Sequence, residues 1–249
     1  MKTCACISLS GGQGKSSVVF FLSLYLSRRG KRVLVVDCDP QADVTFYLGH
    51  EVKPSEPTLL EVLNGQIQPE DGIYETGHPD LFLCPADRNL SKIVPYLINT
   101  GTAASVLKRR LKGVQDAFDY ALVDVQPSIS QISLTAAGAS EFVLIPCEAL
   151  VKGVNSLAST LEFLHQQQEL EAFTGKILGV VPFRDRIVGC QQTKASRNAI
   201  AAMAEISSLP ILPSIVESER YKQALDAGEL PPDELLHAFE KISEVLSHA

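Results

Sequence analysis

Residues 9–17 of the chain read LSGGQGKSS, and this stretch decides the fold class. An apolar run over residues 3–9 leads into it, and an apolar run with helical character over residues 18–26 follows it. A strand, a glycine-rich turn and a helix N-terminus in this order bind phosphate, because successive backbone N–H groups point inward and the helix dipole adds partial positive charge. The glycines let the backbone approach anionic oxygens without an intervening Cβ.

The same stretch carries the side chains that a bound nucleotide requires. Lys15 can reach the β- and γ-phosphates, and the Ser16 hydroxyl can ligate Mg²⁺. The usual phosphate loop has a further glycine where this chain has Leu9, so the match is to a deviant form, with a chance glycine-rich turn as the alternative. The strand–loop–helix context favours nucleotide binding. The residues expected to contact the nucleotide are Gly11, Gly12, Gln13, Gly14, Lys15, Ser16 and Ser17.

The length and composition of the chain fit one α/β domain. Of its 249 residues, 45% are hydrophobic and 20% are charged, and we expect residues 1–249 to form a single nucleotide-binding domain. The net charge of −7 excludes a molecule that binds nucleic acid through overall positive charge, although it leaves room for a local basic face. No apolar run reaches about 18 residues, so the sequence predicts no segment that spans a membrane.

The cysteine and histidine residues show no spacing typical of metal ligands. We expect the six cysteines to be small buried side chains in a reducing cytosol. The five histidines are equally dispersed, so the only metal we predict is Mg²⁺ bound with the nucleotide. The cysteines are Cys4, Cys6, Cys38, Cys84, Cys147 and Cys190.

Short apolar runs alternate with helical patterns, which predicts a doubly wound, mostly parallel sheet with helices on both faces. The last helix has one apolar stripe and starts after two prolines, so it should pack on the domain. Strands are expected near residues 3–9, 32–37, 80–84, 120–125, 141–147 and 176–182, with a further short strand near 209–212. Helices are expected near residues 15–29, 57–64, 89–98, 103–117, 130–138, 153–172, 191–207, 219–227 and 232–248.

Acidic residues follow two of the predicted strands. Asp37, Asp39 and Asp43 come directly after the second strand, and Asp124 ends the strand that starts at Tyr120. Because ligands of doubly wound sheets sit beyond the carboxyl ends of the strands, these acids should face the same crevice as the phosphate loop. One carboxylate there can orient the attacking water, and Asp124 can contact Mg²⁺ through its water shell. A solvated turn and an ordinary strand end are the alternatives.

Three segments together resemble the ParA family of deviant Walker ATPases in order and spacing: residues 11–17, 37–41 and 120–128. Residues 142–147 resemble the apolar strand of that family that ends in proline, and Pro213 resembles a proline of its adenine-side loop. The resemblance covers most of the chain, and it implies the fold of P-loop nucleotide hydrolases.

The resemblance also implies roles for single residues and for the whole chain. Asp39 is the acid critical for hydrolysis, Lys15 is catalytic, and Ser16 and Asp124 share the Mg²⁺ site with Asp39. Members of the family bind ATP, pair face to face as homodimers with two nucleotides between them, and hydrolyse ATP slowly when a partner stimulates them. Many of these dimers bind DNA without sequence preference and position a cargo through an adaptor protein, which implies a cytoplasmic, nucleoid-associated protein.

The chain departs from the family at one position. Relatives carry a lysine just before Gly-Gly that neutralises phosphate across the dimer interface, whereas this chain has Ser10. Either the trans contact is lost, or another cation replaces it, and Lys152 is the best candidate because it follows the strand at residues 141–147 and so lies on the same edge as the phosphate loop. A solvated lysine is the alternative. A serine at this position also resembles the branch of the family that distributes carboxysomes.

Basic clusters suggest where DNA would bind, although a solvated face is the ordinary explanation of each. The densest is residues 108–112. The last helix is acidic, which argues against membrane binding through an amphipathic helix. Two other classes remain: a metabolic enzyme of the same fold that uses ATP to activate a carboxylate, and an electron-transfer ATPase with an iron–sulfur cluster, which would need better placed cysteines.

Overall fold

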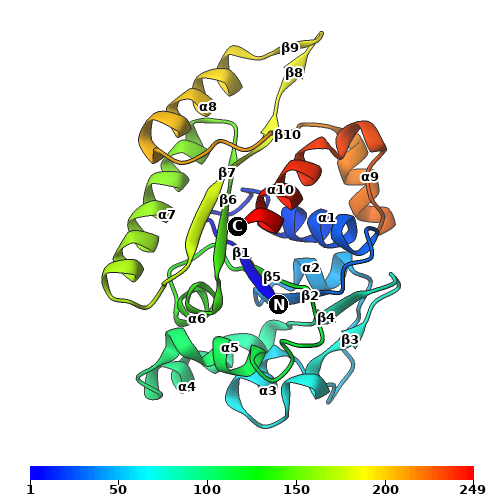
Figure 1. Ribbon diagram of the computed structural model, residues 1–249, viewed down its shortest axis with the longest axis vertical. Coiled ribbons are helices and arrows are strands. Elements are labelled where there is room, and N and C mark those ends of the chain that lie inside the picture. The colour runs from blue at the N-terminus through cyan, green and yellow to red at the C-terminus, as the bar shows by residue number, and fades with distance from the viewer.

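A computed structural model describes residues 1–249 and shows an eight-stranded sheet at the centre of the molecule (Figure 1). The strand order is β10-β7-β6-β1-β5-β2-β4-β3, and every neighbouring pair is parallel except β3 with β4. A separate hairpin joins β8 to β9. The strands are β1 (Lys2–Cys6), β2 (Val33–Cys38), β3 (Tyr74–Glu75), β4 (Leu81–Cys84), β5 (Tyr120–Val125), β6 (Phe142–Glu148), β7 (Lys176–Asp185), β8 (Ile187–Val188), β9 (Gln191–Gln192) and β10 (Ile215–Val216).

Helices cover both faces of the sheet, so the predicted doubly wound, mostly parallel architecture is confirmed (Figure 1). The α-helices are α1 (Lys15–Ser27), α2 (Asp43–Tyr47), α3 (Leu59–Asn64), α4 (Val94–Asn99), α5 (Ala103–Leu111), α6 (Gln131–Ala139), α7 (Val151–Glu169), α8 (Lys194–Ser207), α9 (Glu219–Ala227) and α10 (His237–His248). Short 3-10 helices occupy Pro69–Gly72, Arg88–Ile93 and Asp233–Leu235.

Each face of the sheet has its own apolar core, because strands such as β2 and β5 are buried along their whole length. Helices α1, α2, α9 and α10 supply the core on one face, and helices α3 to α8 supply the core on the other. No helix is long and apolar enough to cross a bilayer. Strand β1 lies between β5 and β6, so the loop that follows it emerges at the middle of the carboxyl edge.

Several predicted boundaries are wrong, and glycine or proline explains some of them. The helix expected at 103–117 ends at Leu111, because Gly113 disfavours helix and Val114 turns into the core. The helix expected at 89–98 is divided into a 3-10 helix and α4, with Pro95 in the first turn of α4. The last helix begins at His237 rather than 232, after a 3-10 turn.

Other differences arise where tertiary pairing decides the structure. The strand expected near 209–212 is a single bridge from Ile211 to Val180, and β10 forms beyond it. Helix α8 starts at Lys194 because the preceding residues form the β8–β9 hairpin. Helix α2 and strand β3 were not expected from the sequence. Five cysteines are buried as predicted, but Cys190 is exposed on the hairpin turn, where no core is available to cover it.

Helix α10 packs against α1 through aromatic side chains. Phe239 is fully buried, and its ring centroid lies 5.6 Å from that of Phe21 and 6.4 Å from that of Tyr221. The amphipathic stripe of α10 therefore faces the domain, with Ile242 and Leu246 also buried.

We expect Phe239→Ala to lower the free energy of unfolding by about 3–5 kcal/mol, because the cavity left between α1 and α10 cannot collapse fully. Urea unfolding of the nucleotide-free protein measures the change. Phe46→Ala is the matched control: Phe46 is 77% exposed, and its loss should cost at most about 0.5 kcal/mol. Equal losses for the two variants would show that α10 does not belong to the cooperative core.

Candidate functional site

The phosphate loop connects β1 to α1 and depends on two glycines in left-handed conformations. Gly12 has φ 78° and Gly14 has φ 91°. At Gly14 the neighbouring strand also leaves no room, because an added Cβ would lie 2.5 Å from Cγ of Phe183. The loop therefore rests directly on the Phe183 ring at Gly14.

A cavity of about 250 Å³ opens beside this loop. It brings together the residues at 11–17 with the predicted acids Asp39 and Asp43. Asp37 and Asp124 are fully buried and do not line it, so the expectation that all four acids face the crevice is right for two of them only. The lining residues are Gly11, Gly12, Gln13, Gly14, Lys15, Ser16, Ser17, Asp39, Gln41, Asp43, Tyr47, Pro127, Phe183 and Arg184.

Lys15 is buried at the start of α1 among charges of both signs. Its Nζ donates to the carbonyl of Ser10 at 3.2 Å. Burial lowers the pKa of Lys15, and the carboxylates of Asp124 and Asp39 oppose that shift. The Lys15 ammonium can donate to a phosphate oxygen in place of the Ser10 carbonyl, and a hydrogen bond between two charged groups is the stronger one.

Asp124 lies beneath the loop, at the carboxyl end of β5. Both carboxylate oxygens are buried and have no hydrogen-bond partner. Burial raises the pKa of Asp124 well above its usual value, Asp37 on the adjacent strand raises it further, and the nearby Ser16 hydroxyl and Lys15 ammonium lower it. Orphaned carboxylate oxygens next to a serine hydroxyl fit a Mg²⁺ site, because that ion prefers oxygen ligands and retains part of its water shell.

The two acids after β2 have different positions. Asp37 is fully buried; it accepts hydrogen bonds from the Asp39 amide at 3.0 Å and from the Thr45 amide and hydroxyl at 3.1 and 2.6 Å. Burial raises the pKa of Asp37 to about 7 in spite of these bonds. Asp39 faces the cavity, and one oxygen accepts from the Gln41 amide at 2.9 Å. Asp37 thus holds the loop that presents Asp39.

Asp43 begins α2 and also lines the cavity. Burial and the charge of Asp39 raise its pKa, while Lys15 lowers it. The carboxylates at this edge therefore repel one another until a cation reaches them.

The structure places Lys152 against the phosphate loop of its own chain. Its Nζ donates to the Gly11 carbonyl at 2.9 Å, and a Cβ on Gly12 would lie 3.7 Å from that nitrogen. Lys152 sits in the first turn of α7 and is exposed, so it stands at the carboxyl edge, as the sequence predicts.

A second cavity, of about 200 Å³, adjoins the first and shares Ser17, Phe183 and Arg184 with it. Its remaining walls come from Phe21 of α1, from residues 216–219 and from α9. Pro213 is half-buried just before β10 and lines neither cavity. Sequence reasoning missed Phe183 and Arg184, although their place after the strand expected at 176–182 puts them on the carboxyl edge.

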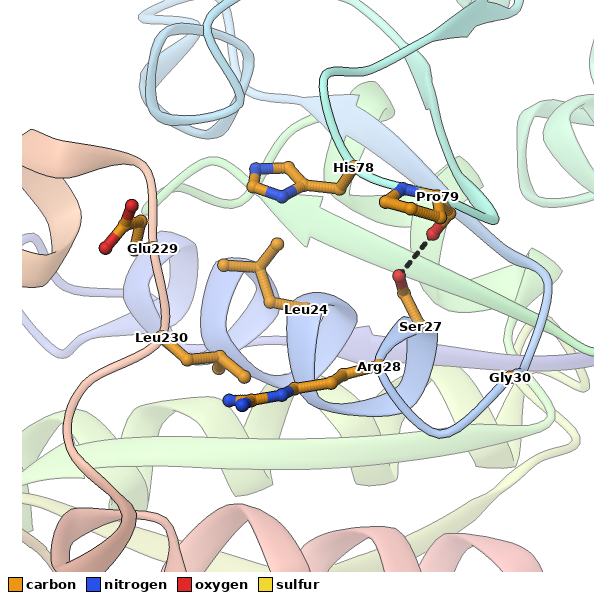
Figure 2. Close-up of a pocket in the computed structure, with 8 residues that line it drawn as sticks. All are labelled: Leu24, Ser27, Arg28, Gly30, His78, Pro79, Glu229 and Leu230. Atoms are coloured by element: carbon orange, nitrogen blue, oxygen red, sulfur yellow. Dashed lines mark hydrogen bonds between the residues drawn. The ribbon is translucent and has the colours of Figure 1, made fainter.

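Figure 2 shows a different pocket, of about 540 Å³, at the far end of α1 from the phosphate loop. Leu24 and Arg28 of α1 face His78 and Leu230 there, and the Ser27 hydroxyl donates to the Pro79 carbonyl. None of the predicted nucleotide contacts lines this pocket, so it is separate from the crevice described above.

Comparison with known proteins gives the family. Residues 1–172 match a family model described as an AAA domain. The chain is 50% identical over 251 aligned positions to maintenance of carboxysome distribution protein A (McdA) of Gloeothece citriformis, covering 99% of this chain and 97% of that protein. The chain belongs to the ParA-type ATPases, in the McdA branch. As a ParA-type ATPase it hydrolyses ATP, and its cofactors are ATP and Mg²⁺.

Two solved structures extend the comparison. A variant of Cyanothece McdA in complex with ATP is 48% identical, with a TM-score of 0.96 and coverage of 99% of this chain and 96% of that chain. Cobyrinic acid a,c-diamide synthase of Mycobacterium smegmatis with bound ADP and magnesium is 26% identical, with a TM-score of 0.82 and coverage of 91% and 93%. ParA-type architecture is thus shared with a metabolic enzyme.

We expect Asp124→Asn to stabilise the nucleotide-free protein at neutral and high pH while abolishing ATPase activity. An acid whose folded pKa is raised stabilises the fold fully only below its unfolded value, and that contribution is lost as the pH rises through the folded pKa. The advantage of the variant should therefore grow above about pH 4, by up to roughly 1.4 kcal/mol per pH unit.

Urea unfolding at several pH values measures this difference. Asp116→Asn provides the control, since Asp116 is exposed and the change removes a carboxylate from the surface rather than from the interior. A difference in the free energy of unfolding between Asp124→Asn and the unmodified chain that stays constant with pH would contradict this prediction. It would show that folding does not raise the pKa of Asp124.

Proposed function

We propose that this ATPase forms a homodimer around two ATP molecules, binds DNA without sequence preference, and positions carboxysomes through an adaptor protein. The single observation that carries the proposal is the 50% identity to an McdA over 99% of the chain. Such a protein would work in the cytoplasm, on the nucleoid, and its hydrolysis would be slow until the adaptor stimulates it.

Within one subunit, the residues of the crevice divide the work among them. The loop amides and Lys15 bind the phosphates, and Ser16 ligates Mg²⁺, with Asp124 and Asp39 contacting its water shell. Asp39 orients the attacking water. The Asp39 backbone is itself held by the hydrogen bond from its amide to the Asp37 carboxylate. Mg²⁺ supplies charge neutralisation on the phosphates.

The adjoining cavity suits the nucleotide base. It opens from the phosphate site at Ser17, Phe183 and Arg184, so a nucleotide that starts on the loop can extend into it. Its remaining walls include the side chains of residues 216–219. We assign the base to this cavity; Pro213 does not line it, and its predicted contact with the nucleotide stays a prediction.

Exposed apolar side chains near the crevice support a dimer that closes over it. Phe46 on α2 is 77% exposed, Ile129 after β5 is 71% exposed, and Val151 at the start of α7 is 73% exposed. All three belong to segments that follow strands at the carboxyl edge. Large apolar side chains left in water at one edge indicate a surface that another protein covers, and a second copy of the chain is the natural occupant.

Lys152 supplies the charge that Ser10 lacks. Its ammonium binds the Gly11 carbonyl in the single subunit and is already exposed, at the face where a second subunit would dock. In the dimer it neutralises the phosphates of the nucleotide held mainly by the other subunit. An uncompensated phosphate in a closed interface would be costly, which makes such a cation necessary.

We expect Lys152→Ala to bind ATP but to lose stable dimers, whereas Lys15→Ala loses nucleotide binding itself, because only Lys15 holds phosphate within the subunit. Titration with a fluorescent ATP analogue and gel filtration with ATP separate these effects. The control is Lys194→Ala at the start of α8. A Lys152→Ala protein that dimerises and turns over normally would refute the trans role of Lys152.

DNA binding would rest on exposed basic residues rather than on the overall charge of −7. Lys108, Arg109 and Lys112 lie on one side of the end of α5, exposed, while Arg110 reaches inward toward the Leu63 carbonyl. Pairing of two subunits would bring two such clusters into one assembly, and phosphate contacts would add across it.

With ATP, the dimer should retard any DNA duplex at low salt, and affinity should fall steeply as salt rises because counterions are released. Lys108→Ala combined with Lys112→Ala should reduce both the affinity and the salt slope, by roughly one unit per lost phosphate contact. Electrophoretic shifts at several salt concentrations test this. A monomer that ignores DNA in the presence of ATP would contradict the proposal.

The alternative is an enzyme that uses ATP to activate a carboxylate. The structural likeness to cobyrinic acid a,c-diamide synthase supports this alternative. That likeness is at 26% identity, against 50% for McdA. An enzyme of that class would show fast turnover with a small acid and no ATP-dependent dimer, so the same gel filtration experiment distinguishes the two.

A further inference from the structure

The outer side of the phosphate loop is joined to β6 and α7 by a row of hydrogen bonds. These bonds connect loop atoms to the strand end and to the first three turns of the helix, which lies beside β6 (Figure 1). They are Ser8 Oγ with Ser156 Oγ (3.0 Å), the Leu9 amide to Thr160 Oγ1 (3.1 Å), the Glu148 amide to Gln13 Oε1 (2.8 Å) and Lys152 Nζ to the Gly11 carbonyl (2.9 Å).

Gln13 is the unusual member of this row. Its side chain is fully buried, its Oε1 accepts from the Glu148 amide, and its Nε2 is buried without any partner. The backbone N–H of Glu148 can only donate, so it fixes which end of the carboxamide faces it. An unpartnered buried amide group destabilises a fold, and an apolar residue of the same size would avoid that. The acceptor is therefore the useful part of the side chain.

The Glu148 backbone is held from the opposite side as well. A Cβ on Gly153 would lie 1.9 Å from the Glu148 carbonyl oxygen, so only glycine lets the first turn of α7 close onto this peptide. The next amide, of Ala149, donates to the Phe183 carbonyl at 2.8 Å. Phe183 is the residue whose ring supports Gly14.

We propose that Gln13 is a positioning residue that fixes the start of α7, so that Lys152 stands over the phosphate loop. The Gln13 carboxamide fixes the position of the Glu148 peptide relative to the loop. Gly153 lets the helix begin directly after this peptide, and Lys152 lies four positions after Glu148. The loop thus places the cation that substitutes for the charge missing at Ser10. This inference rests on the trans role of Lys152 given above.

The test compares Gln13→Met, which keeps the size of the side chain and removes the acceptor, with Ser156→Ala, which removes a different bond of the same row. The first readout is hydrogen exchange of the Glu148 amide in the nucleotide-free protein. We expect exchange in Gln13→Met to be at least about ten-fold faster, since the amide loses its acceptor, and exchange in Ser156→Ala to be unchanged.

The second readout is ATP-dependent dimerisation and turnover. At saturating ATP, Gln13→Met should lose about ten-fold in dimer affinity and in stimulated turnover, because Lys152 is no longer held over the phosphate loop. The loss should be non-additive with Lys152→Ala, because both changes remove one function. Ser156→Ala should dimerise normally, which separates positioning of Lys152 from general loosening of α7.

The outcomes distinguish the two proposals. Unchanged exchange at Glu148, normal dimerisation of Gln13→Met, or losses that simply add to those of Lys152→Ala would each overturn the positioning role of Gln13 while leaving Lys152 in its trans role. Normal dimerisation of Lys152→Ala, together with fast exchange in Gln13→Met, would instead refute the trans role of Lys152 and show that the bond to Glu148 serves only the fold.

Discussion

Close approach of the Phe183 ring to the backbone of Gly14 is the contact on which the site depends. The ring occupies the space of a missing Cβ, and both the ring and the phosphate loop line the same cavity. The same strand end carries Arg184 into both cavities and accepts the Ala149 amide. One residue of β7 therefore joins the loop, the start of α7 and the wall of the adjoining cavity.

Two carboxylates are buried at this edge, which is unfavourable for the folded protein. Asp124 is buried with no hydrogen-bond partner, and Asp37 is buried beside it on the neighbouring strand. Burial raises the pKa of both, because a charged carboxylate is poorly solvated there. Asp37 accepts hydrogen bonds from Asp39 and Thr45, so its buried carboxylate supports the loop that carries Asp39.

The proposed trans role of Lys152 would place the interfacial cation on α7 rather than in the phosphate loop, which changes what must be held in place. A lysine within the loop is placed by the loop itself, whereas Lys152 depends on the relative position of a helix and a loop more than a hundred residues apart in the chain. The hydrogen bonds between the two elements meet that need.

The sequence by itself determined the parallel sheet, the phosphate loop and the shared crevice of Lys15, Ser16 and Asp39, because these follow from local pattern and from the rule that parallel strands present their carboxyl ends at one edge. It also placed Lys152 at that edge. Only the tertiary structure decided that Phe183 supports Gly14 and that Pro213 lines neither cavity. Those features depend on which side chains meet across the fold, and no local pattern along the chain encodes such meetings.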